Sequence, residues 1–211
     1  MDARGTLELV QGWSARLGAA AAMAWRVWPD LETPAEELVR DFRDDAGHRR
    51  VVDPVFLRAV RGLPPPGEAE EGAADVRAWG AAASGGSFQG LAPGLQSLTS
   101  RRDEPIEVWT ETELCVLHAL WRAARLRGDG GLRARCLDAA RWHLEHVQPD
   151  NATNHPWGIH VFVVLGALDG RLEAISHAEQ MLHASLVRLG RPDRLSGHIL
   201  EDGGAELRRV F

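Results

Sequence analysis

Side chains that could ligate a metal or transfer a proton are concentrated around one loop of the sequence. They are His143, His146, Asp150, His155 and His160. Imidazole and carboxylate groups are the usual nitrogen and oxygen ligands of zinc, and they are also common general acids and bases. His143 and His146 are one turn apart in an expected helix, so both can point toward the helix end where Asp150 emerges. With His155 or His160 from the next helix, they would form a site for a divalent metal such as zinc.

The same loop has the side chains to act on a polar molecule without a metal. Asp150 would serve as a general acid or base, with its pKa raised by the neighbouring Trp157, and His155 and His160 are the other candidates for catalysis. Hydrogen-bonding amides and flat aromatic rings, a combination suited to sugars or peptides, accompany these groups. The candidates for ligand binding are Asn151, Asn154, Trp142 and Trp157.

A purely structural role would account for much of the same composition. Asn151 and Asn154 are the only asparagines in the chain. Asn154 and Thr153 are favourable residues at a helix start, Pro156 suits a first helical turn, and Trp157 can close a hairpin. Both interpretations stay open at this level, and the sequence by itself requires no cofactor.

Helical periodicity surrounds the loop on both sides. Thr110 and Glu113 have the spacing of a capping box, and the helix that they begin ends at the glycine-rich turn 128–131. Residues 159–165 are apolar on every side and β-branched, which is compatible with a strand, but their helical neighbours favour a buried helix. The remaining helices are expected at 132–148, 157–168 and 171–189.

The chain as a whole divides into a helical arm, a linker and a helical domain. Residues 1–62 form the N-terminal helical region, and proline, glycine and acidic clusters in residues 63–105 indicate a linker or irregular crossing. Residues 106–211 form the C-terminal helical-hairpin domain, whose pattern becomes short and mixed after Pro192. Helices of the first two regions are expected at 7–28, 34–46 and 55–61, with one or two further turns around 73–83.

The composition excludes several classes of protein. The chain has 211 residues, 45% hydrophobic and 26% charged, as in a globular protein, and a formal net charge of −6. The net charge is small and the sequence has no stripe of basic residues, so neither nucleic acid nor a membrane is expected as a partner. Charged residues at the N-terminus argue against an export signal, which predicts a cytoplasmic protein with Cys115 and Cys136 as reduced core residues.

A short internal repeat supports stacked hairpins. Residues 116–120 match residues 164–168 at a separation of 48 positions, which implies two successive helical hairpins, 110–148 and 156–189. In addition, Gln148-Pro149-Asp150 followed by Trp157-Gly158 is similar to the Gln-Asp-Gly-Trp turn of terpene cyclases. Residues 110–189 therefore resemble the α/α-toroid proteins, which also include protein prenyltransferases and six-hairpin glycosidases. The glycine of that turn and the Asp-x-Asp-Asp acid of the cyclases are missing here, so no catalytic residue is carried over.

The resemblance implies an all-α fold of consecutive antiparallel hairpins, toroid-like or a partial solenoid, with an N-terminal helical arm. Two functions follow. The first is a non-catalytic helical scaffold that binds another protein or itself, with Trp13, Trp25 and Trp28 as candidate anchors. The alternative is an α/α-toroid-like hydrolase or lyase that acts on a carbohydrate or another polar substrate at the 150–160 loop.

Overall fold

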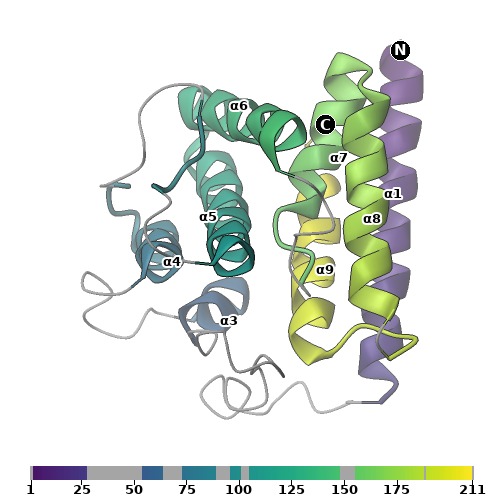
Figure 1. Ribbon diagram of the computed structural model, residues 1–211, viewed down its shortest axis with the longest axis horizontal. Helices are drawn as coiled ribbons and strands as arrows, with labels where there is room; N and C mark the ends of the chain where they lie inside the picture. The colour runs from purple at the N-terminus through teal and green to yellow at the C-terminus, as the bar shows by residue number, and fades with distance from the viewer. Residues whose placement is uncertain are drawn as a thin grey trace.

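Helices make up the regular structure of the chain. The computed structural model describes residues 2–27, 54–63, 73–88, 96–100, 105–147, 155–187 and 189–210. Within these ranges there are eight α-helices and no strand, so the predicted all-α class is confirmed (Figure 1). The helices are α1 (Ala3–Trp25), α3 (Pro54–Val60), α4 (Ala74–Ser84), α5 (Ile106–Arg127), α6 (Gly130–His146), α7 (Ile159–Asp169), α8 (Leu172–Val187) and α9 (Arg194–Leu207).

The two predicted hairpins are present as α5–α6 and α7–α8. Gly128 ends α5 with a φ of 64°, a left-handed conformation that favours glycine, and the Asp129 carboxylate caps α6 by accepting from the Leu132 N–H. The expected capping box at Thr110 is wrong, because α5 begins one turn earlier at Ile106. The carboxylate of Glu113 instead accepts hydrogen bonds from the backbone of Leu98 and Thr99.

The segment compatible with helix or strand is helical. All of residues 159–167 are buried within α7, which explains why no amphipathic period marks this helix in the sequence. Neighbouring helices cover it on several sides: α8 is its hairpin partner, and α1, α6 and α9 also pack against it. The α7 helix is thus the central element of this half of the molecule.

The C-terminal segment departs from the prediction. Residues expected to be short and mixed form the regular helix α9, which the Asp193 carboxylate caps by accepting from the Ser196 N–H. The helix lies antiparallel to α1 at close range (Figure 1), and the Ser14 hydroxyl donates to the carbonyl of Gly204 over 2.9 Å. A Cβ on Gly197 would lie 2.9 Å from the Cβ of Ala24. Glycines therefore serve close helix packing here, where the sequence pattern suggested irregularity.

Residues 54–63 and 73–88 contribute to the same core as the hairpins. The α4 helix has 11 residues, about three turns, which is longer than the expected one or two. Trp79 from α4 contacts the ring of Phe56 from α3 at 4.9 Å, and its indole N–H donates to the sulfur of Cys115. Cys115 and Cys136 are buried and unbonded to each other, as predicted. Among the described helices, none has the length and apolarity needed to cross a membrane.

Candidate functional site

Only the second half of the predicted loop can be placed. Asp150, Asn151 and Asn154 lie outside the described residues. From His155 onward the chain runs through the interior: His155, Trp157 and His160 are all buried, and Trp157 is 1% exposed. Trp157 is therefore an internal contact of the fold and offers no open platform to a ligand.

His155 is held between two carboxylates from different helices. Its Nδ1 lies 2.7 Å from Oε1 of Glu111 in α5, and its Nε2 lies 3.5 Å from Oδ2 of Asp193 at the start of α9. The same Glu111 oxygen also accepts from the indole N–H of Trp157 at 3.2 Å. We call this group of Glu111, His155, Trp157 and Asp193 the histidine clasp, because it joins α5, the entry to α7 and the cap of α9.

The electrostatics of the clasp favour a charged imidazolium. Burial alone would lower the pKa of His155, but the charges of Glu111 and Asp193 and their hydrogen bonds raise it to about 9. Burial raises the pKa of Asp193, and the hydrogen bonds from His155 and the Ser196 N–H bring it below its ordinary value. At neutral pH the clasp therefore holds His155 as a cation whose two N–H groups face carboxylates, so this histidine is not a free general base.

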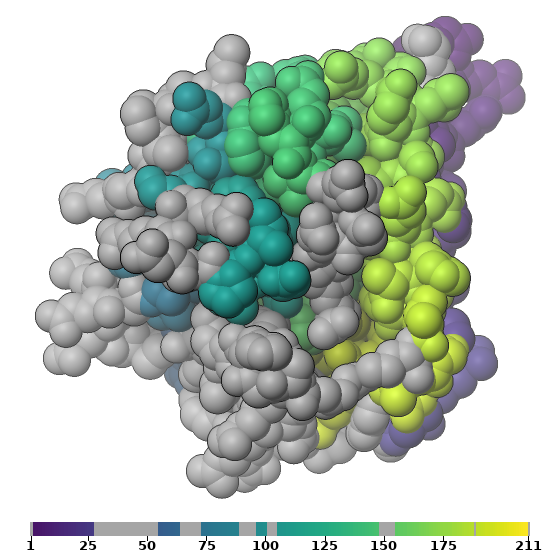
Figure 2. All heavy atoms as spheres, viewed as in Figure 1, coloured from purple at the N-terminus to yellow at the C-terminus, as the bar shows by residue number. Residues whose placement is uncertain are grey.

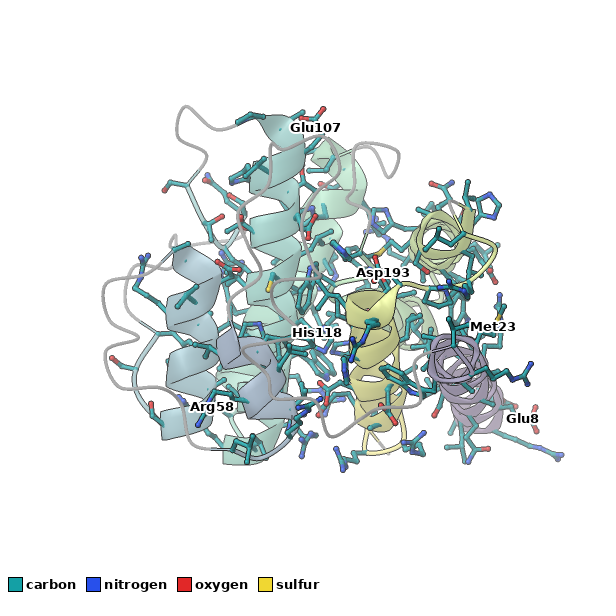
Figure 3. All side chains as sticks on the ribbon, turned by 90° about the horizontal axis from the view of Figure 1, so that it is seen from below. Glu8, Met23, Arg58, Glu107, His118 and Asp193 are labelled. Atoms are coloured by element: carbon teal, nitrogen blue, oxygen red, sulfur yellow. The ribbon has the colours of Figure 1, made fainter. Side chains whose placement is uncertain are left out.

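A second polar group lies between α5, α7 and α9. His118 from α5 extends toward α9 in the middle of the molecule, where Figure 3 also places Asp193. Its Nδ1 accepts from the N–H of Gly158 at 3.3 Å, so its Nε2 carries the proton and donates to Asp202 at 3.1 Å. The other oxygen of Asp202 accepts from Arg122. His118 is therefore a core histidine whose two ring nitrogens both have hydrogen-bond partners.

The backbone conformation and small size of Gly158 allow its N–H to reach His118. Its φ is 69°, and a Cβ there would lie 3.3 Å from the carbonyl oxygen of Leu114 and 3.2 Å from the side chain of Leu117. Glycine is thus required both by conformation and by space. Its backbone N–H can then approach the α5 helix closely enough to fix the tautomer of His118.

Charge is balanced within this second group. Burial would raise the pKa of Asp202, yet His118, Arg122 and His160 together lower it to about 2. One turn further along both helices, Arg125 forms two hydrogen bonds with the fully buried Glu206. These ion pairs join α5 to α9 at successive turns of both helices.

His160 has a different environment from His155 and His118. Its ring centroid lies 4.4 Å from that of His118, yet neither of its nitrogens has a hydrogen-bond partner among the described residues. Burial, followed by the electrostatic influence of the neighbouring His118, lowers its pKa well below the ordinary value. His160 is consequently a neutral, enclosed ring at neutral pH. Gly203 faces it, and a Cβ at that position would lie 3.3 Å from Nδ1.

The two histidines considered as metal ligands point to separate places. His143 is fully buried with Nε2 3.6 Å from Glu113, whereas His146 is exposed and stacks on Trp142 with an interplanar angle of 8°. In the ranges that the structure describes, no three His, Cys, Asp or Glu side chains are arranged to hold a metal ion. The structure thus brings His155 to Glu111 and His160 to His118, and it separates His143 from His146.

Most partners of these histidines were missed in the sequence. No motif singles out Glu111, Arg122, Asp193 or Asp202 in the sequence, although they form the polar centre of the molecule. A signal was present in α5, where Glu111, His118, Arg122 and Arg125 recur at steps of seven, four and three and so share one helical face. Polar residues at helical spacing in an otherwise apolar segment indicate an internal network as well as a solvated face.

These contacts limit the chemistry of the described site. His155 is charged and paired, His118 uses both nitrogens internally, and His160 is enclosed. The arrangement is suited to joining helices through buried ion pairs. Comparison with models of protein families, with curated proteins and with solved structures finds no match for this chain.

Proposed function

We propose that this chain is a non-catalytic helical scaffold that associates with a second copy of itself through the outer face of α8. The observation that carries the proposal is a stripe of exposed residues that extends along the whole helix. The stripe itself contains no arginine, aspartate or glutamate. Its members, at steps of four, four, three and four, are Leu172, Ser176, Gln180, His183 and Val187. We refer to these five residues as the α8 stripe.

The α8 stripe is unusual in its exposure. Leu172 is 79% exposed and Val187 is 62% exposed, the two highest values among the large apolar side chains of the described residues. Figure 2 shows the side chains of α8 as a continuous strip on one face of the molecule. The centres of protein interfaces are depleted in charged residues relative to other surfaces, and exposed apolar groups mark such contacts. The flanking Glu173 and Glu179 would form the charged rim.

The order of residues along the stripe is self-complementary. In a two-fold contact between antiparallel copies of α8, Leu172 of one copy faces Val187 of the other, and Ser176 faces His183. The two-fold axis then passes between positions 179 and 180, so Gln180 lies beside the axis and close to Gln180 of the second copy, where each amide can donate to the other. Such a dimer has apolar contacts at both ends of the paired helices and hydrogen bonds in the middle. This complementarity favours a second copy over an unrelated partner.

A groove beside the stripe increases the area that such a contact can cover. It has a volume of about 410 Å³ and lies between α6 and α8, with Leu144 and Val147 on one wall and Leu172, Ser176 and Gln180 on the other. A 16-residue helix is about 24 Å long, so a contact through α8 and this groove belongs to the smaller, weaker class of interfaces. We therefore expect a dissociation constant in the micromolar range.

The enzymatic alternative has less support. It needs His155, Trp157 and His160 as groups that touch a substrate, and each is buried with internal contacts. The α8 stripe lies on the opposite side of the α7–α8 hairpin from these residues and is open to solvent. The exposed surface, and not the buried polar centre, is therefore the better candidate for the functional part of the molecule.

Sedimentation velocity over a concentration series up to about 100 μM tests the proposal, since a contact with a micromolar dissociation constant is saturated there. The unmodified protein should sediment as a dimer. Leu172→Glu should remain monomeric, whereas Leu126→Glu, the same change at a residue that is 57% exposed on α5, should dimerise normally.

A second pair of variants tests the contact between the two Gln180 side chains at the centre of the dimer, without altering side-chain size. Gln180→Glu places two carboxylates opposite each other and should weaken dimerisation at least about tenfold, because facing like charges repel. Gln11→Glu makes the same change on the exposed side of α1 and should have no effect. A monomer at every concentration, or equal dimerisation of Leu172→Glu and Leu126→Glu, would overturn the proposal.

A further inference from the structure

A smaller cavity lies where the α5–α6 turn meets the end of α9. It has a volume of about 200 Å³ and is independent of the α8 stripe and of the histidine clasp. Three guanidinium groups line it, together with one carboxylate and an apolar wall. The side chains that define it are Trp121, Arg125, Asp129, Arg133, Arg209 and Val210.

Positive charge exceeds negative charge around this cavity. Glu206 lies behind Arg125, accepts two hydrogen bonds from it, and is also 3.7 Å from Nη1 of Arg209. One carboxylate therefore serves two guanidinium groups. Arg133 stacks over the ring of Trp121 at 5.1 Å from its centroid, and Asp129 is engaged as the cap of α6. Three cations against the two carboxylates of Asp129 and Glu206 leave an excess of positive charge.

One side chain that borders the cavity has a hydrogen-bond donor without an acceptor. Trp121 is 2% exposed, and in the part of the chain that the structure describes its indole N–H has no hydrogen-bond partner. Gly130, the first residue of the 17-residue helix α6, and Gly128, the C-cap of α5, both lie on the cavity wall, so the start of one helix and the end of the other meet the same space. An anion with oxygen acceptors would satisfy the guanidinium groups and the indole N–H of Trp121 together.

We infer that this cavity binds a small oxyanion, a carboxylate or a phosphate. Pockets for drug-sized ligands usually measure about 300 to 1,000 Å³, so a cavity of about 200 Å³ excludes nucleotides and other large anions. Trp121 and Val210 provide an apolar wall that suits a small hydrocarbon group attached to the anion. Arg133 and Arg209 are the expected principal ligands, since Arg125 is already paired twice with Glu206.

Isothermal titration calorimetry tests this inference. The titrants are sodium phosphate and sodium benzoate, at a constant ionic strength set by chloride. At least one of the two anions should bind saturably. The tighter one identifies the source of the oxyanion, inorganic phosphate or an organic carboxylate. Arg133→Gln should weaken that binding at least about tenfold, because a charge-assisted hydrogen bond is lost. Arg4→Gln, which removes the same charge from an exposed residue paired with Glu8, should bind normally.

Arg209→Gln provides a second variant that spares the fold, because its side chain is 53% exposed. Circular dichroism melting curves verify that each variant is folded before titration. Saturable binding that is lost in Arg133→Gln or Arg209→Gln supports the site. The absence of saturable binding of both anions, or equal affinity in the Arg133, Arg209 and Arg4 variants, would overturn it. Neither result depends on whether the protein dimerises.

Discussion

The histidine clasp makes the stability of this protein depend on pH in the alkaline range. Glu111 and Asp193 favour the protonated form of His155, so its pKa in the folded state is about 9, compared with 6.5 for an ordinary histidine. A group whose pKa rises on folding contributes its full stabilisation below the unfolded pKa, and the contribution is lost as the pH rises through the folded pKa. The perturbation to apply is therefore an increase in pH from 7 to 9.

The expected magnitude follows from the two pKa values. Their difference of about 2.5 pH units corresponds to about 3 kcal/mol of stabilisation at acidic pH, at 1.36 kcal/mol per unit. At pH 7 about 2.5 kcal/mol of this contribution remains, and at pH 9 less than about 0.5 kcal/mol. The free energy of unfolding should thus fall by about 2 kcal/mol over this interval because of His155 alone.

The composition of the chain makes this measurement unusually clean. There is no lysine and no tyrosine, so the groups whose ordinary pKa values lie in or near this range are the histidines, the two cysteines and the α-amino group. Burial raises the pKa of Cys136, which keeps that thiol neutral in the folded state. Urea unfolding followed by circular dichroism at several pH values gives the free energy of unfolding, and His155→Gln removes only the histidine contribution from the comparison.

The difference in stability between the unmodified protein and His155→Gln should shrink by about 2 kcal/mol from pH 7 to pH 9. His146→Gln, a change at an exposed histidine, should follow the unmodified protein throughout. If His155→Gln does not fold, NMR titration of the unmodified protein measures the pKa of His155 directly. Parallel stability curves for the first two proteins, or titration of His155 near pH 6.5, would refute the reasoning.

Two further predictions concern packing and buried polar atoms. Gly197→Ala should lower the free energy of unfolding by about 1 to 3 kcal/mol, because the added Cβ overlaps Ala24. Gly12→Ala, in the open part of α1, should raise it by about 0.5 to 1 kcal/mol. Thermal and urea unfolding measure both changes. His160→Leu removes two ring nitrogens that lack partners among the described residues and should raise the free energy of unfolding by on the order of 1 kcal/mol. His118→Leu removes one of the two hydrogen bonds to the buried carboxylate of Asp202, which keeps its pair with Arg122, and should lower the free energy of unfolding by about 1 to 3 kcal/mol, so equal effects of the two histidine changes would contradict the assignment.

The hairpins could be predicted because their local signals agree with their packing. Gly128 and Asp129 specify the end of α5 and the start of α6 through backbone conformation and capping, and both act within a few residues. The α7 helix could be predicted only from its helical neighbours in the sequence, since a segment buried on all sides has no amphipathic periodicity. The prediction failed at α9, where Gly197, Gly203 and Gly204 lower helix propensity but permit close contact with α1 and His160.

The buried polar centre was harder to predict than the helices. Sequence crowding identified His143, His146, His155 and His160 as a group, yet their environments differ because each helix turns its residues toward different neighbours. The partners that define His155 are Glu111 and Asp193, which lie 44 and 38 positions away along the chain. Pairing at such separations depends on tertiary packing, which local spacing does not encode.

The antiparallel contact of α1 with α9 has a consequence for how the protein is made. The hydrogen bond from Ser14 to Gly204 joins residues 190 positions apart. At a synthesis rate of about 5 to 20 residues per second, α1 leaves the ribosome roughly 10 to 40 seconds before α9. During that interval the apolar side of α1, with Val10, Trp13 and Leu17, lacks the helix that covers it in the finished molecule. Nascent chains of this protein should therefore need a chaperone to hold α1 until α9 arrives.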